Sequence, residues 1–99
     1  MSKIADIMRA GKALIEDRGW GRGDGANPPR GCYCVLTAIA GDEKVYHYDA
    51  VRFFERANGI GPTESGISVI GWNDAPGRTQ EEVLAAFDKA ITLAEQENV

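Results

Sequence analysis

The stretch "TQEEVLAAFDKAITLAEQ", residues 79–96, decides the fold class of this chain. Its apolar residues recur at the three- and four-residue spacing of one helix face, at Val83, Phe87, Ala90, Ile91 and Ala94. Thr79 and Glu82 form a capping-box pair, in which each side chain accepts a hydrogen bond from the other residue's backbone N–H. Glu81 adds a second acid to the first turn, where the helix dipole favours negative charge. The stretch therefore predicts an amphipathic helix.

A second helix is predicted at residues 3–18, between a Ser2 N-cap and a stop at Gly19. One face of this segment carries an apolar stripe made of Ile4, Ile7, Met8, Gly11, Leu14 and Ile15. A glycine inside a helix costs about 1 kcal/mol relative to alanine. Gly11 therefore predicts that another helix approaches closely at that point.

Two shorter helices follow. Residues 32–40 form an apolar run that ends at Gly41, and the lack of a period of two favours a helix over a strand. Asp49 offers the N-cap of the next helix, which is closed by Asn58 and Gly59. The apolar face of that helix consists of Ala50, Phe53, Phe54 and Ala57.

The remaining segments are loops or short pieces. Residues 19–31 hold five glycines and two prolines and predict a long loop. Residues 42–48 indicate a short extended segment, and residues 67–72 fit either one short strand or a helical turn. We therefore expect an all-α fold, with residues 1–99 forming a single compact domain of about four helices. The helices at 3–18, 32–40 and 79–96 are expected to surround one core.

Composition excludes several classes of function. The formal net charge is -4, from 15 acidic and 11 basic residues without a basic cluster, which argues against nucleic-acid binding. No apolar stretch reaches the roughly 18 residues of a membrane span. The charged N-terminal segment is unlike a signal peptide, so we expect a cytoplasmic protein with reduced thiols and no structural disulfide.

The sequence predicts no metal site and no cofactor. Structural zinc needs four ligands, and the chain has two cysteines and one histidine without the usual spacings. On one helix, Cys32 and Cys34 would point about 200° apart, so they cannot act as a pair. Cys32 would share a face with Val35 and Leu36, and Cys34 would share one with Ala38.

One catalytic hypothesis remains open beside simple packing. Cys34 or Cys32, with His47 and either Asn73 or Asp74, has the residue types of a thiol-dependent hydrolase or amidase. A helix N-terminus would lower the pKa of such a thiol. Free cysteine is nevertheless among the most buried residue types, and packing is the favoured interpretation for Cys34.

The segment "WNDAPGRT", residues 72–79, is the favoured binding surface. Trp72, Asn73, Asp74 and Arg78 combine the residue types enriched in protein interfaces. The same residues also fit a rigid turn, in which Asn and Asp bond to the backbone and Trp72 fills the core. The two interpretations are compatible. Arg22 and Arg30, which flank the glycine-rich loop, offer a third hypothesis of anion or nucleotide binding.

Three segments together resemble a family of small uncharacterised proteins of actinobacteria and their phages: "GKALIEDRGW" (11–20), "CYCVLTAI" (32–39) and "WNDAPGRTQEEVLAAFDKAI" (72–91). Cys34 falls on the family's cysteine, Thr37 departs from its glycine, and the residues that match its ending are Trp72, Asn73, Asp74, Arg78 and Thr79. The resemblance implies an actinobacterial or phage origin and a shared fold. It implies no activity.

The sequence therefore predicts a non-catalytic interaction or regulatory protein, phage-borne and binding a host protein. The alternatives are the thiol-dependent enzyme and a small-molecule (nucleotide) binding protein. A homo-oligomer stays open.

Overall fold

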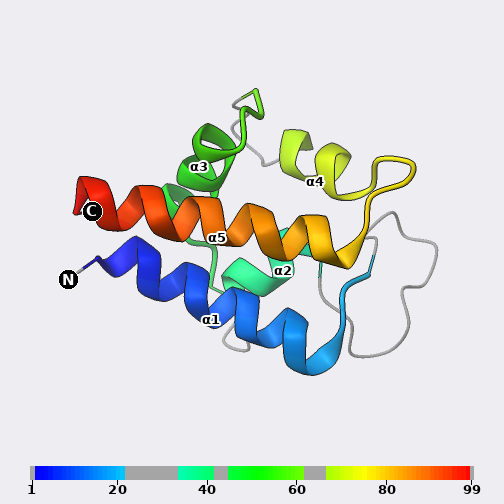
Figure 1. Cartoon of the computed structure of the whole chain (residues 1–99), viewed down its shortest axis with the longest axis horizontal. Helices are drawn as coiled ribbons and strands as arrows, with labels where there is room; N and C mark the ends of the chain where they lie inside the picture. Colours follow the sequence, from blue (N-terminus) through cyan, green and yellow to red (C-terminus); the bar gives the residue numbers. More distant parts are fainter. Residues whose placement is uncertain (1, 22–33, 42–44, 62–66, 99) are drawn as a thin grey trace.

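The computed structural model describes residues 2–21, 34–41, 45–61 and 67–98, and these hold five helices and no strand. The helices are α1 (Lys3–Arg18), α2 (Val35–Ala40), α3 (Tyr48–Ala57), α4 (Ile67–Asn73) and α5 (Gln80–Glu97). The two long helices α1 and α5 run antiparallel and side by side, α2 and α3 pack against this pair, and α4 packs against α2 and α3 (Figure 1). The predicted all-α class is confirmed.

One apolar cluster joins all five helices. Its buried members are Met8, Ile15, Val35, Ala38, Ile39, Ala50, Val51, Phe54, Val69, Val83, Ala86, Phe87 and Ala90. Phe54 lies at its centre, with its ring centroid 5.2 Å from that of Phe87 and 5.6 Å from that of Trp72, which it meets edge-on. Burial of each such ring contributes about 2 to 3 kcal/mol, so this cluster holds the short helices to the long ones.

The helix ends follow the local signals of the sequence. The Ser2 hydroxyl accepts a hydrogen bond from the Ala5 amide at 3.0 Å, and α1 ends at Gly19 with φ at 91°. At the start of α5, the Thr79 hydroxyl accepts from the Glu82 amide at 3.2 Å. Glu82 Oε1 accepts in return from the Thr79 amide at 3.0 Å. The predicted N-caps at Ser2 and Thr79 and the predicted stop at Gly19 are confirmed.

The start of α2 corrects the expected helix at residues 32–40. Cys34 is the N-cap, with extended backbone (φ -84°, ψ 174°), and the first helical residue is Val35. The physical reason lies in Thr37, whose hydroxyl accepts a hydrogen bond from the Cys34 amide at 2.9 Å. That bond satisfies the backbone N–H of Cys34 and holds this residue as the N-cap, so the helix begins at the next residue, Val35. Cys32 lies outside the described residues.

The other corrections concern α3 and α4. His47, not Asp49, is the N-cap position of α3, and Asp49 lies in the first turn, where its carboxylate suits the helix dipole. Residues 67–72 are part of α4, so the strand alternative is wrong and the helices number five in the described chain. A short apolar run does not distinguish the two structures by periodicity, and packing of Val69 into the core selects the helix.

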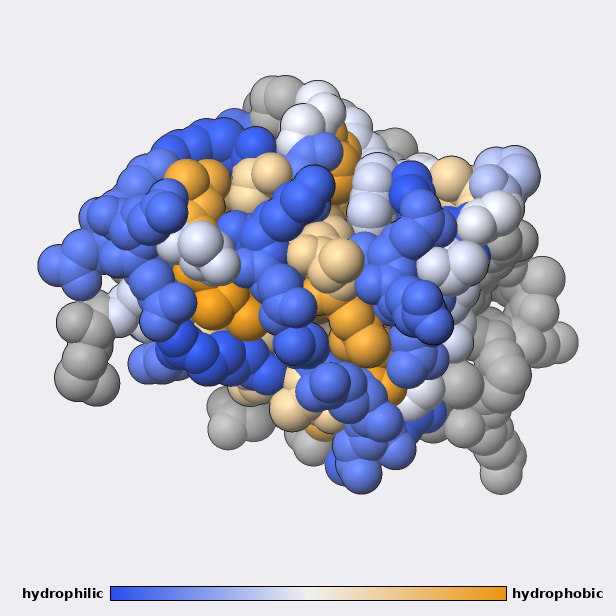
Figure 2. Space-filling model, viewed as in Figure 1, coloured by the Kyte–Doolittle hydropathy of each residue, from blue (hydrophilic) through white to orange (hydrophobic). Residues whose placement is uncertain are grey.

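Charged side chains link the long helices on their outer faces. Arg9 of α1 bonds Asp6 and Glu95, and Lys12 Nζ lies 2.7 Å from Asp88 Oδ1 of α5. The hydrogen bond to Asp88 raises the pKa of Lys12 above its ordinary value. Figure 2 shows this face, on which hydrophilic residues surround small apolar patches over the two helices.

In the described part of the chain, every helix is too short or too polar to cross a membrane.

Gly11 lies where α1 closely approaches its neighbours, as its position in the stripe predicts. A Cβ atom at this residue would lie 3.0 Å from the Ala38 carbonyl oxygen of α2 and 3.1 Å from Phe87 Cε1 of α5. The nearer contact is backbone, which moves only if α2 moves. Gly71 in α4 provides a contrast, because a Cβ atom there meets no atom of the described residues within 4 Å.

We therefore predict opposite effects of the same substitution at these two glycines. Gly11→Ala gains helix propensity but overpacks the α1–α2–α5 contact, and a net loss of roughly 1 kcal/mol is expected. Gly71→Ala gains propensity without a clash and should add up to about 1 kcal/mol. Urea unfolding of the two variants measures both changes. Stabilisation by Gly11→Ala would contradict the close approach of α2.

Candidate functional site

The side chain of Asn73, at the end of α4, is buried and forms four hydrogen bonds. Its Oδ1 accepts from the Trp20 indole Nε1 at 2.7 Å and from the Val35 amide at 3.2 Å. Its Nδ2 donates to the Gly21 carbonyl at 3.3 Å and to Asp74 Oδ1 at 2.9 Å. Two donors and two acceptor positions are the full capacity of a carboxamide. Asn73 therefore ties together the chain after α1, the start of α2 and the end of α4.

Trp72 and Arg78 form a second junction, between α4 and α5. The guanidinium carbon of Arg78 lies 4.0 Å from the centroid of the Trp72 ring, and Nε donates to the Trp72 carbonyl at 2.9 Å. Nη1 lies 3.5 Å from Glu82 Oε2. Trp72 is half-buried and packs on the core, while Arg78 covers its outer face. The turn interpretation of residues 72–79 thus describes these contacts well.

The residues of the thiol hypothesis lie around both ends of α2. Cys34 precedes the first residue of α2, and Asn73 bonds the amide of Val35 beside it. His47 instead lines a groove with Ile39 and Gly41, at the C-terminal end of the same helix. The Asn73 amide is fully occupied by its four partners, so it has no hydrogen bond left to orient an imidazole. The structure brings Asn73 close to Cys34 and places His47 at the other end of α2.

Arg22 and Arg30, the cations of the nucleotide hypothesis, lie outside the described residues, as does Cys32.

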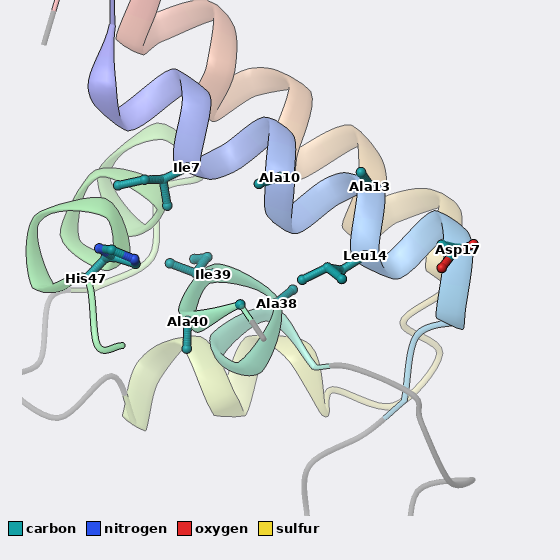
Figure 3. Close-up of a pocket in the computed structure, with 10 residues that line it drawn as sticks. Ile7, Ala10, Ala13, Leu14, Asp17, Ala38, Ile39, Ala40 and His47 are labelled. Atoms are coloured by element: carbon teal, nitrogen blue, oxygen red, sulfur yellow. The ribbon is translucent and has the colours of Figure 1, made fainter. Parts of the chain in front are cut away.

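A cavity with a volume of about 680 Å³ lies between α1 and α2. We call it the α1–α2 groove, and its lining consists of Ile7, Ala10, Ala13, Leu14, Asp17, Ala38, Ile39, Ala40, Gly41 and His47. In Figure 3, Ile7 and Leu14 of α1 point toward Ile39 and Ala38 of α2, with His47 beside Ile7 and Asp17 at the other end of α1. Eight of the ten described residues that line it are apolar or glycine, so its chemistry suits an apolar guest.

Exposed aromatic residues adjoin the His47 end of the groove. A smaller cavity of about 170 Å³ shares Ile7 and His47 with the groove and is also lined by Tyr48. Tyr46 and Tyr48 are 49% and 42% exposed, and their ring centroids lie 6.2 Å apart. Tyrosine is enriched in protein interfaces because it buries a large area with few rotatable bonds. We call Tyr46 and Tyr48 the tyrosine lip of the groove.

The sequence contained a signal for the groove, but the stripe of residues 3–18 merged two helix faces. The buried face of α1 consists of Ala5, Met8, Gly11 and Ile15. Ile7 and Leu14, seven residues apart, are only partly buried and turn toward the groove with the exposed Ala10. Residues seven apart share one face of a helix, so a second stripe was present beside the first.

In the described part of the chain, the geometry defines a small helical protein with an apolar surface groove and a buried asparagine that forms four hydrogen bonds. A protein-family model described as a family of unknown function, DUF6197, matches residues 1–93. The chain belongs to this family. Comparisons with curated proteins and with solved structures give no match.

Removal of the Asn73 amide should strongly destabilise the protein. Asn73→Ala leaves the Val35 amide and the Trp20 indole N–H without their acceptor, and each buried donor so abandoned costs about 1 to 3 kcal/mol. We expect a loss of about 3 kcal/mol in the free energy of unfolding, measured in urea. Gln96→Ala, on the exposed face of α5, is the control and should change it by less than about 0.5 kcal/mol. An equally small change for Asn73→Ala would contradict the structural role.

Proposed function

We propose that this protein is a non-catalytic interaction module that binds a partner protein through the α1–α2 groove and its tyrosine lip. The observation that supports this most directly is the groove itself, an apolar surface beside exposed aromatic rings. Exposed apolar surface costs free energy in water, and a groove of this kind commonly marks an interaction site. Burial of Ile7, Leu14 and the two tyrosines against a partner would recover that energy.

The charge of the groove favours a protein over a nucleotide. A nucleotide needs cations or free backbone N–H groups around its phosphates. Among the described residues that line the groove there is no lysine or arginine, and Asp17 contributes a carboxylate. An apolar protein segment meets no such conflict.

The Trp72–Arg78 surface is the other candidate interface. A depression of about 270 Å³ beside these residues is lined by Asn58, Trp72, Arg78, Glu82, Ala85, Ala86 and Lys89. Arg78 already contacts Trp72 and Glu82 there, so a partner would have to compete with those contacts. Asn73 is 1% exposed and supports this surface from behind without reaching a partner. We therefore assign the binding role to the groove.

The setting of this interaction follows the resemblance in the sequence. We propose a phage-borne protein of actinobacteria that acts in the host cytoplasm on a host protein. This origin is supported by the three matching segments, of which "WNDAPGRT" at residues 72–79 is the most specific.

Site-directed photo-crosslinking tests the proposed function. Benzoylphenylalanine placed at Ala13, an exposed residue of the groove, should give a discrete adduct with one protein in an actinobacterial lysate. Excess unlabelled protein should compete the adduct away, and excess Ala13→Arg protein should not, because the new side chain fills the groove.

Two other positions serve as controls. Ala85 reports on the Trp72–Arg78 surface and Gln96 on background labelling, and both are exposed on α5. Discrete labelling from position 85 alone would move the interface to that surface. No discrete adduct from any position, or the same bands from positions 13 and 96, would contradict the proposed function.

A further inference from the structure

We infer that the α1–α2 groove takes an amphipathic helix of the partner protein, two to three turns long, with a Lys or Arg side chain that meets Asp17. The inference rests on the proposed function and adds the chemistry and shape of the partner. It is carried by the length of the groove, the size of its lining side chains and the charge at its end.

The length of the groove sets the length of the guest. Ile7 and Asp17 line its two ends, ten residues apart on α1, which corresponds to about 15 Å at 1.5 Å per residue. A partner helix lying along this distance has about ten residues, or nearly three turns. In the described chain no sheet edge is present for an extended peptide to pair with. Two helical walls therefore favour the helix-in-groove mode of recognition.

The lining is made largely of small residues. Ala10 and Ala13 line it on α1, and Ala40 and Gly41 line it at the end of α2. Small side chains let another helix axis come near the short end of the usual 8–10 Å spacing. The partner must then supply the large apolar side chains. On a helix, side chains that point into one groove recur at i, i+3 or i+4, and i+7.

The charge at one end fixes which polar residue the partner needs. The Asp17 side chain is 79% exposed, and the C-terminal end of α1 adds the negative end of its helix dipole. Arg18 Nε lies 3.8 Å from the Asp17 carboxylate, a loose exposed pair that a partner cation can displace. At the other end stands His47, beside the tyrosine lip. A helix with its cation at one end is thus bound in one direction.

Selection from an unbiased peptide library tests this inference on the full chain. A yeast-displayed library of randomised 16-residue peptides is sorted for binding to the protein, and clones that also bind Ala13→Arg are removed. The enriched peptides should share apolar residues at i, i+3 or i+4, and i+7, with a Lys or Arg at one end. Proline at the centre of a synthesised winner should lower its affinity at least about tenfold, because it breaks the helix.

Reversal of charge at Asp17 is the sharpest part of the test. Asp17→Lys should weaken the selected basic peptides about fivefold or more, and a new selection against it should enrich Asp or Glu at the same position. Glu16→Lys is the matched control, because Glu16 is the exposed neighbour that does not line the groove. It should leave affinity within about twofold. Thermal unfolding verifies that all variants are folded.

The outcomes separate this inference from the proposed function. If position 13 crosslinks to a partner but the enriched peptides lack helical spacing, or bind Asp17→Lys equally well, the inference fails and the interaction module stands. If position 13 captures no partner, the proposed function fails. A wild-type dimer that Ala13→Arg converts to a monomer in sedimentation would make a second copy the occupant, and would overturn the inference.

Discussion

The carboxamide of Asn73 is the constraint on which the arrangement of the short helices depends. Helix α2 has six residues, too few to be stable alone, so its position comes from its neighbours. Its apolar residues reach the core, and its first amide donates to Asn73 Oδ1 at 3.2 Å. The same oxygen accepts from the indole of Trp20, just after α1. One buried side chain thereby fixes the C-terminal end of α1 next to the N-terminal end of α2. The helices α1 and α2 form the two walls of the groove.

The sequence predicts structure best where the stabilising interactions join residues that are close together in the chain. The helix at 79–96 and the caps at Ser2 and Thr79 depend on residues within a few positions, and the structure confirms them. The role of Asn73 depends on partners 38 to 53 residues away, which no local pattern reveals. The start of α2 and the identity of α4 lie between these cases. The hydroxyl of Thr37 sets the start of α2, and packing of Val69 into the core favours a helix for α4. The short apolar runs alone do not predict either feature.

The groove could not be recognised from the apolar pattern of the helix. Ile7 and Leu14 satisfy the rule for a core stripe, and the structure places them at its edge, facing the groove. Helix α2 approaches α1 at Gly11, while Ala10 and Ala13 are exposed and line the groove. The residues of the thiol-enzyme hypothesis do not lie together in one site. Cys34 caps α2, Asn73 braces it, and His47 borders the groove.

The central claim is that the Asn73 amide holds the ends of α1 and α2 together in the folded protein. Hydrogen exchange followed by NMR tests it directly through two protons, the Trp20 indole N–H and the Val35 amide N–H. Both donate to the same buried oxygen, so both should exchange as slowly as the amides of the α5 core around Phe87. Exchange of either proton as rapid as that of a freely solvated N–H group would show that the junction opens freely, and would contradict the account.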